Sequence, residues 1–236
     1  MALDVYVGSL TRYYAGNWES ISGRAARERG QPSRIAGPGA ASDGVDLDEE
    51  IRPAIVAWRA ELGRSLGDRI ALPLDWDESP ETPYFTGRPG WEGFGSLVLW
   101  AAYAEHPALR RPDSLPEEWD NDPVLVRSNA ASFRSRFSHL VRNVELWLPG
   151  PFDLTFEGED VDGRRLVMGA TAMLRRQLED LNAATWKAGA DVVVRWAREP
   201  LPVNAAFEQS ARYGFAVLFD LAQRAVERRL PMKLDH

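Results

Sequence analysis

Short stretches in which hydrophobic and polar residues alternate predict strands along the chain. In residues 3–7, the side chains of Leu3, Val5 and Val7 share one face, and we expect that face to be buried. Two later stretches flank the dipeptide Asp162-Gly163, which is typical of a tight hairpin turn. The expected strands cover residues 3–7, 144–148, 152–157 and 164–168, and the apolar run 191–196 predicts a further buried strand.

Apolar residues that recur every three or four positions predict amphipathic helices elsewhere. Residues 49–66 show this spacing, and the acidic residues at 48–50 suit the positive end of a helix dipole. Pro53 fits only in the first turn of such a helix, which supports a start near residue 49. The other expected helices cover residues 10–21, 94–104, 128–142 and 204–228, a short stretch that opens in the capping-box sequence 114–117, and a stretch that Thr171 caps.

These helices and strands follow one another in mixed order, so we predict an α+β fold and not a doubly wound parallel sheet. The fold would combine a mixed sheet of short strands with packed amphipathic helices and a long C-terminal helix. A length of 236 residues suits a single domain that spans residues 1–236. Residues 22–46 are rich in Gly, Pro and Arg, and we expect a mobile loop there.

Composition and charge narrow the possible functions. The chain has no cysteine, which excludes disulfides, Cys-ligated zinc and a thiol nucleophile. No apolar run reaches the roughly 18 residues of a membrane span, and the first residues lack a signal-peptide pattern, so we expect a cytoplasmic protein. A net charge of −7 makes nucleic acid an unlikely partner and fits a basic protein partner, although mild acidity is also explained by solubility alone.

The sequence contains no recognisable catalytic motif. Its three histidines, His106, His139 and His236, do not form an H-x-x-x-H zinc pair. Residues 93–96 come nearest to a nucleophile elbow, but no glycine follows Ser96, and the start of a helix is the better interpretation. Because phosphate-binding and dinucleotide-binding loops are also missing, we expect no cofactor and no metal.

Three acidic clusters remain as candidate sites. Carboxylates hold Mg²⁺ or Ca²⁺, or share acid and base roles in hydrolysis, whereas solvated surface acids meet arginines on a partner protein. No cluster has the spacing of a calcium-binding loop. The clusters are Asp75, Asp77, Glu78 and Glu81; Glu117, Glu118, Asp120 and Asp122; and Glu157, Glu159, Asp160 and Asp162.

The first two clusters each contain a tryptophan, Trp76 and Trp119. Tryptophan among acids is typical of a protein–protein contact, although a tryptophan that pins a loop to a core gives the same pattern. We predict a partner-binding surface, and the alternative hypothesis is a small carboxylate-based, metal-assisted hydrolase that uses Asp75 and Asp77. The predicted surface consists of Asp75, Trp76, Asp77, Glu78, Glu117, Glu118, Trp119 and Asp120.

Residues 3–14, Leu-Asp-Val-Tyr-Val-Gly-Ser-Leu-Thr-Arg-Tyr-Tyr, resemble the start of an uncharacterised family of bacterial proteins. That resemblance implies no activity and no site residue. In size, acidity and mixed α+β pattern, the chain is also similar to cytoplasmic immunity proteins, and this second resemblance implies a toxin as the partner. We therefore expect a non-catalytic protein-binding module.

Overall fold

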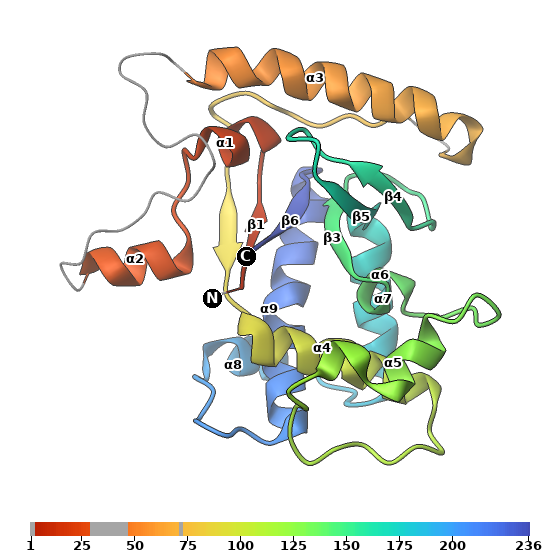
Figure 1. Ribbon diagram of the computed structural model, residues 1–236. Helices are drawn as coiled ribbons and strands as arrows, with labels where there is room; N and C mark the ends of the chain where they lie inside the picture. The colour runs from red at the N-terminus through yellow and green to blue at the C-terminus, as the bar shows by residue number, and fades with distance from the viewer. Residues whose placement is uncertain (1–2, 29–46, 71–72) are drawn as a thin grey trace.

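A computed structural model describes residues 3–28, 47–70 and 73–236 of the chain (Figure 1). In this part of the chain, six strands form one mixed sheet in the order β2-β1-β6-β3-β5-β4. β3 and β5 run parallel, and the other neighbouring strands are antiparallel. Helix α3 covers one face of the sheet, and α4, α7 and α9 cover the other. The predicted α+β fold is confirmed, including the long helix near the end of the sequence.

The strands and helices follow one another in mixed order along the chain. The strands are β1 (Asp4–Val7), β2 (Phe85–Gly87), β3 (Val144–Leu148), β4 (Phe156–Glu159), β5 (Arg165–Ala170) and β6 (Met232–Asp235). The helices are α1 (Leu10–Ala15), α2 (Ile21–Glu28), α3 (Leu47–Leu66), α4 (Gly90–Glu105), α5 (Pro123–Ser128), α6 (Ser138–Val141), α7 (Thr171–Ala184), α8 (Ala190–Arg198) and α9 (Phe207–Arg228), with short 3₁₀ turns η1 (Gly67–Arg69) and η2 (Trp119–Asn121).

Both faces of the sheet are buried, so alternate side chains of one strand enter two different cores. In β1, Val5 and Val7 face the core under α4, α7 and α9, as the sequence predicts. Tyr6 faces the opposite core, under α1 and α3, and is fully buried as well. Because β1 has neighbours on both sides in the sheet, even the polar residue Asp4 is buried.

The backbones of α4 and α9 approach closely where Gly93 meets Gly214. A Cβ atom on Gly214 would lie 2.1 Å from the carbonyl oxygen of Gly93, so a larger residue cannot fit unless a helix moves. Gly95 leaves similar room for the ring of Trp119. Gly93 and Gly95 therefore serve helix packing, and Ser96, which follows Gly95, is fully buried.

The apolar run 191–196 forms helix α8 and not the predicted buried strand. Gly189 precedes the helix as its N-cap residue, and Asp191 lies in its first turn. Val193 packs into the core, whereas Val194 is about half exposed. Burial of one helical face against α9 overrides the strand preference of three consecutive valines.

Several helix predictions also need correction. The predicted helix 128–142 does not form: Ser128 ends α5, and only the single turn α6 lies within the rest of the range. No helix forms over residues 114–117. Thr171 does not cap α7, because its hydroxyl donates to the carbonyl of Leu148 on β3. Helix α3 begins earlier than predicted, so Pro53 lies inside it and not in its first turn.

The predicted mobile loop 22–46 is wrong for residues 22–28, which belong to α2, and its remainder, residues 29–46, lies outside the described part of the chain. Among the helices that the structure describes, none is long and apolar enough to span a membrane.

Candidate functional site

Residues 75–81, which we call the acidic segment, cross the sheet face beneath α3 and alternate between exposed and buried side chains. Asp75, Asp77 and Glu81 are exposed, whereas Trp76 and Glu78 are only 5% and 6% exposed. The three exposed carboxylates therefore point to solvent, whereas the side chains of Trp76 and Glu78 point into the protein. The sequence predicts the exposed acids correctly, but it does not show that Glu78 points inward.

Glu78 holds the acidic segment against the first turn of α1. One carboxylate oxygen accepts a 3.1 Å hydrogen bond from the backbone N–H of Leu10, and the other accepts a 2.7 Å bond from the N–H of Thr11. These N–H groups have no partner within the helix, and a negative charge at this end of a helix is favourable. The indole N–H of Trp76 also donates to Glu78. The Glu78 carboxylate therefore forms its hydrogen bonds within the protein and does not face a partner.

Two arginines fix the ends of the acidic segment. The guanidinium of Arg59, on α3, donates a 2.6 Å hydrogen bond to the carbonyl of Trp76 and lies 4.9 Å from the centre of its ring. Arg12, on α1, donates a 2.6 Å bond to the carbonyl of Thr82 and a second bond to Pro80. With Glu78, these contacts hold the backbone that carries the exposed carboxylates at several points.

The Asp77 carboxylate closes a local turn. It accepts a 2.9 Å hydrogen bond from the backbone N–H of Ser79 and a 3.0 Å bond from the Ser79 hydroxyl. The bond from the Ser79 N–H is the main cause that holds the pKa of Asp77 below its usual value. Asp77 therefore stays ionised at neutral and mildly acidic pH.

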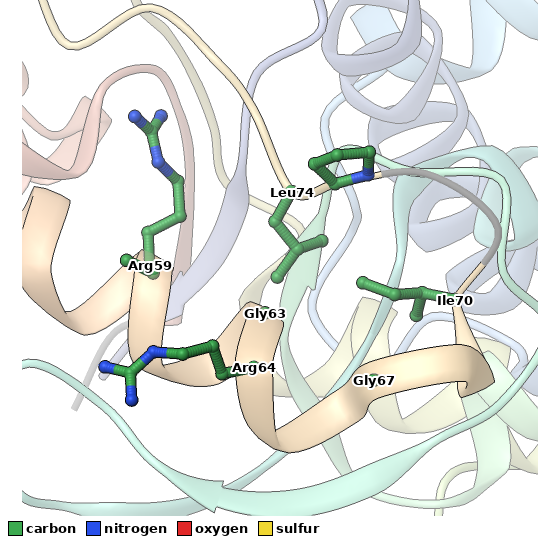
Figure 2. A pocket seen from close by; sticks show the side chains of 8 residues that line it. Arg59, Gly63, Arg64, Gly67, Ile70 and Leu74 are labelled. Carbon is green, nitrogen blue, oxygen red and sulfur yellow. The ribbon is translucent and has the colours of Figure 1, made fainter.

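The acidic segment lines one hollow on the surface, and a second hollow lies beside Leu74, just before the segment begins. One, of about 440 Å³, lies between the segment and the end of α9, where Arg228 and Arg229 face Asp75 and Asp77. The other, of about 390 Å³, lies between α3 and the side chains of Ile70, Pro73 and Leu74 (Figure 2). Figure 2 shows Leu74 directed over Gly63, while Arg64 extends away from the hollow. The segment thus lies within an uneven surface of mixed charge.

The second predicted segment, residues 117–120, lies elsewhere on the molecule. Trp119 packs edge-on against Phe94 of α4, with ring centres 6.3 Å apart, and joins the core under α4 and α9. Trp76 belongs to the core on the opposite face of the sheet. The carboxylates of Glu117, Glu118 and Asp120 are exposed. The structure therefore separates the two acidic segments by the thickness of the sheet and does not form one joint surface from them.

The third acidic cluster contains a buried ion pair. Glu157, Glu159 and Asp162 are exposed, but Asp160 is 5% exposed and lies 3.2 Å from the ammonium of Lys233. Asp160 lines a groove of about 690 Å³ between α3 and β4. Its two oxygens already accept four hydrogen bonds from within the chain, so its bonding capacity is used internally.

Two further candidates for catalysis, His139 and Ser96, are enclosed in the fold. His139 is fully buried, and its Nδ1 lies 3.3 Å from the side-chain amide of Gln177. The Ser96 hydroxyl has no hydrogen-bond partner and no exposure. Among the described residues, no three His, Cys, Asp or Glu side chains lie close enough together to hold a metal ion. Neither His139 nor Ser96 is therefore open to a substrate at the surface.

Comparisons of the sequence with protein-family models and curated proteins, and of the structure with solved structures, find no match. The resemblance of residues 3–14 to an uncharacterised bacterial family stays a prediction.

Proposed function

We propose that this chain is a non-catalytic protein-binding module that presents the acidic segment, residues 75–81, to a basic surface on a partner protein. The observation that carries the proposal is the fixed alternation within this segment. Asp75 and Asp77 point outward, while Trp76 and Glu78 anchor the backbone to α1 and α3.

Rigid presentation lowers the cost of binding. A partner that contacts an ordered segment does not need to order it, so less of the interaction free energy is lost as conformational entropy. The side chain of Asp75 is 75% exposed, and its nearest cation, Arg59, lies 3.5 Å away at the edge of the segment. The Arg59 side chain is only 17% exposed, but solvent around the Asp75 carboxylate weakens this pair, so a partner arginine can compete for the carboxylate.

Charge supports the choice of a basic partner. The chain carries a net charge of −7, which accelerates encounters with a basic protein and makes them sensitive to salt. In its narrower form, the proposal describes an immunity protein of the cytoplasm that covers the basic surface of a toxin. A gene for a toxin beside the gene for this chain would support that narrower form.

The test is affinity capture from the source cell with the wild-type chain and a charge-reversed variant, Asp75→Lys with Glu81→Lys. Both positions are exposed, so the fold should tolerate the changes. We expect the wild-type chain to capture a basic protein, and the variant to bind that purified protein about tenfold or more weakly.

The matched control is Glu117→Lys with Asp120→Lys, which changes the net charge by the same amount on the second segment. This control should keep its affinity within about threefold of the wild type, since only long-range attraction changes. Equal losses in the two variants would mean that overall charge, and not the acidic segment, determines binding. Capture of no protein by the wild-type chain would contradict the proposal itself.

A further inference from the structure

The last strand in sequence order, β6, joins two parts of the sheet. On one side β6 pairs with β1, whose other neighbour is β2. On the other side it pairs with β3, which is followed in the sheet by β5 and β4. Among the described strands, no other contact connects these two parts within the sheet. The register of a four-residue strand therefore determines how the two parts of the sheet meet.

Lys233 lies at the centre of this joint. It is in register with Tyr6 on β1 and with Leu146 on β3. Its neighbours Met232 and Leu234 face the core under α4 and α9, whereas its own ammonium faces the opposite side of the sheet. There it lies 5.4 Å and 5.7 Å from the ring centres of Tyr13 and Tyr14.

Lys233 is 3% exposed, and Asp160 from the turn between β4 and β5 is the partner of its ammonium at 3.2 Å. The same carboxylate oxygen accepts a 2.9 Å hydrogen bond from the Tyr14 hydroxyl. The other oxygen accepts bonds from the backbone N–H groups of Asp162 and Arg164. The pair thus links β6, α1 and the β4–β5 turn in one saturated network.

Stability alone does not explain this pair. Two charges withdrawn from water lose hydration, and well-packed apolar residues in their place are often as stable or more so. Burial lowers the pKa of Lys233 below its usual value, with Asp160 opposing the shift, which reflects the same cost. A second lysine, Lys187, lies exposed at the surface, where a lysine is normally found.

The pair does distinguish one strand register from its neighbours. Side chains alternate along a strand, so a slip of one residue would turn Lys233 into the apolar core under α4 and α9 and bring Met232 or Leu234 to Asp160. The buried charge would then have no partner, which is far more costly than an apolar mismatch. We propose that the Lys233–Asp160 pair acts as a register lock that specifies how β6 inserts between β1 and β3.

The test is the double variant Lys233→Met with Asp160→Asn. The asparagine still accepts the two backbone N–H groups and can donate to the Tyr14 hydroxyl, while methionine fills the lysine's volume. We expect a melting temperature within about 5 °C of the wild type. In NMR spectra, the amides of β1, β6 and β3 should give a second set of signals, from chains in which β6 has slipped.

The control is Lys187→Met, which removes the exposed lysine. Both this variant and the wild type should show one set of signals, with NMR contacts between Val5 and Leu234 that mark the native register. A double variant with a single set of signals and the native pairing would overturn the proposal. So would a double variant that does not fold, because the pair would then supply stability and not register.

Discussion

The carboxylate of Glu78 accepts a 2.7 Å hydrogen bond from the backbone N–H of Thr11, although 67 positions separate the two residues in the sequence. Glu78, which the sequence places on the binding surface, therefore accepts hydrogen bonds from the first turn of helix α1. This contact also divides the acidic segment into anchoring residues and presenting residues, and the two groups should respond differently to mutation.

Replacement of Glu78 by alanine should destabilise the fold by about 2–4 kcal/mol, because the N–H groups of Leu10 and Thr11 and the indole of Trp76 all lose their acceptor. Glu78→Gln should cost less, since its amide oxygen still accepts. Glu81→Ala is the control, and its exposed side chain predicts a change within about 0.5 kcal/mol. Urea denaturation measures all three, and equal stability of the Glu78→Ala and Glu81→Ala variants would contradict the anchoring role.

Stability should fall in mild acid because of His139. Burial lowers the pKa of this imidazole to about 4, so the folded chain keeps it neutral. The unfolded chain binds a proton below its ordinary pKa of about 6.5. The stabilisation from the neutral ring is therefore complete above about pH 6.5 and is lost as the pH falls toward 4.

The expected loss from His139 is roughly 2–3 kcal/mol between pH 7 and pH 4.5. Denaturation at these two pH values measures it, and His139→Leu should show a smaller difference between them. NMR titration of the native protein gives the direct check, since a His139 resonance that titrates near pH 6.5 would show that the ring is not held neutral.

Alkaline pH should unfold the chain through its tyrosines. Burial raises the pKa of Tyr6, Tyr13 and Tyr14, so these hydroxyls stay protonated in the folded state. The unfolded chain loses the protons near pH 10, so stability is complete below about pH 10 and decreases above it. In an ultraviolet titration, these tyrosines should ionise together with unfolding. Their ionisation at pH 10, with unchanged circular dichroism, would contradict this prediction.

Two glycines inside helices should respond to alanine in opposite directions. In Gly214→Ala, the new methyl group meets the backbone of Gly93, so we expect a loss of about 1–3 kcal/mol or more. In Gly63→Ala, on α3, no atom lies within 4 Å of the new Cβ, and the higher helix propensity of alanine should add about 0.5–1 kcal/mol. Thermal denaturation measures both, and a neutral Gly214→Ala would show that α4 and α9 do not meet as closely as described.

The spacing of hydrophobic residues in the sequence predicts a helix or strand well where one face of that element is buried in a core. The period of α3, α4 and α9 and the alternation of β1 and β3 are examples, because each of these elements contributes a continuous apolar stripe or face to a core. The prediction fails at residues 191–196, where a strand preference competes with helix packing. Strand β6 is missed because it has only four residues and Lys233, unlike most lysines, points inward.

Only part of the candidate site could likewise be predicted from the sequence. Exposure of Asp75 and Asp77 follows from composition and loop position alone. The inward turn of Glu78 depends on helix α1, and the pairing of Asp160 depends on Lys233, 73 positions later. Contacts between distant segments leave no periodic signal, so neither residue could be assigned to the interior from the sequence.

The most direct measurement is amide hydrogen exchange of this chain with and without the partner that it captures. We predict that binding slows exchange in the peptides that cover residues 75–82 and leaves residues 117–121 unchanged. Slower exchange around residues 117–121 or α8, with no change at residues 75–82, would contradict the claim that the acidic segment is the binding surface.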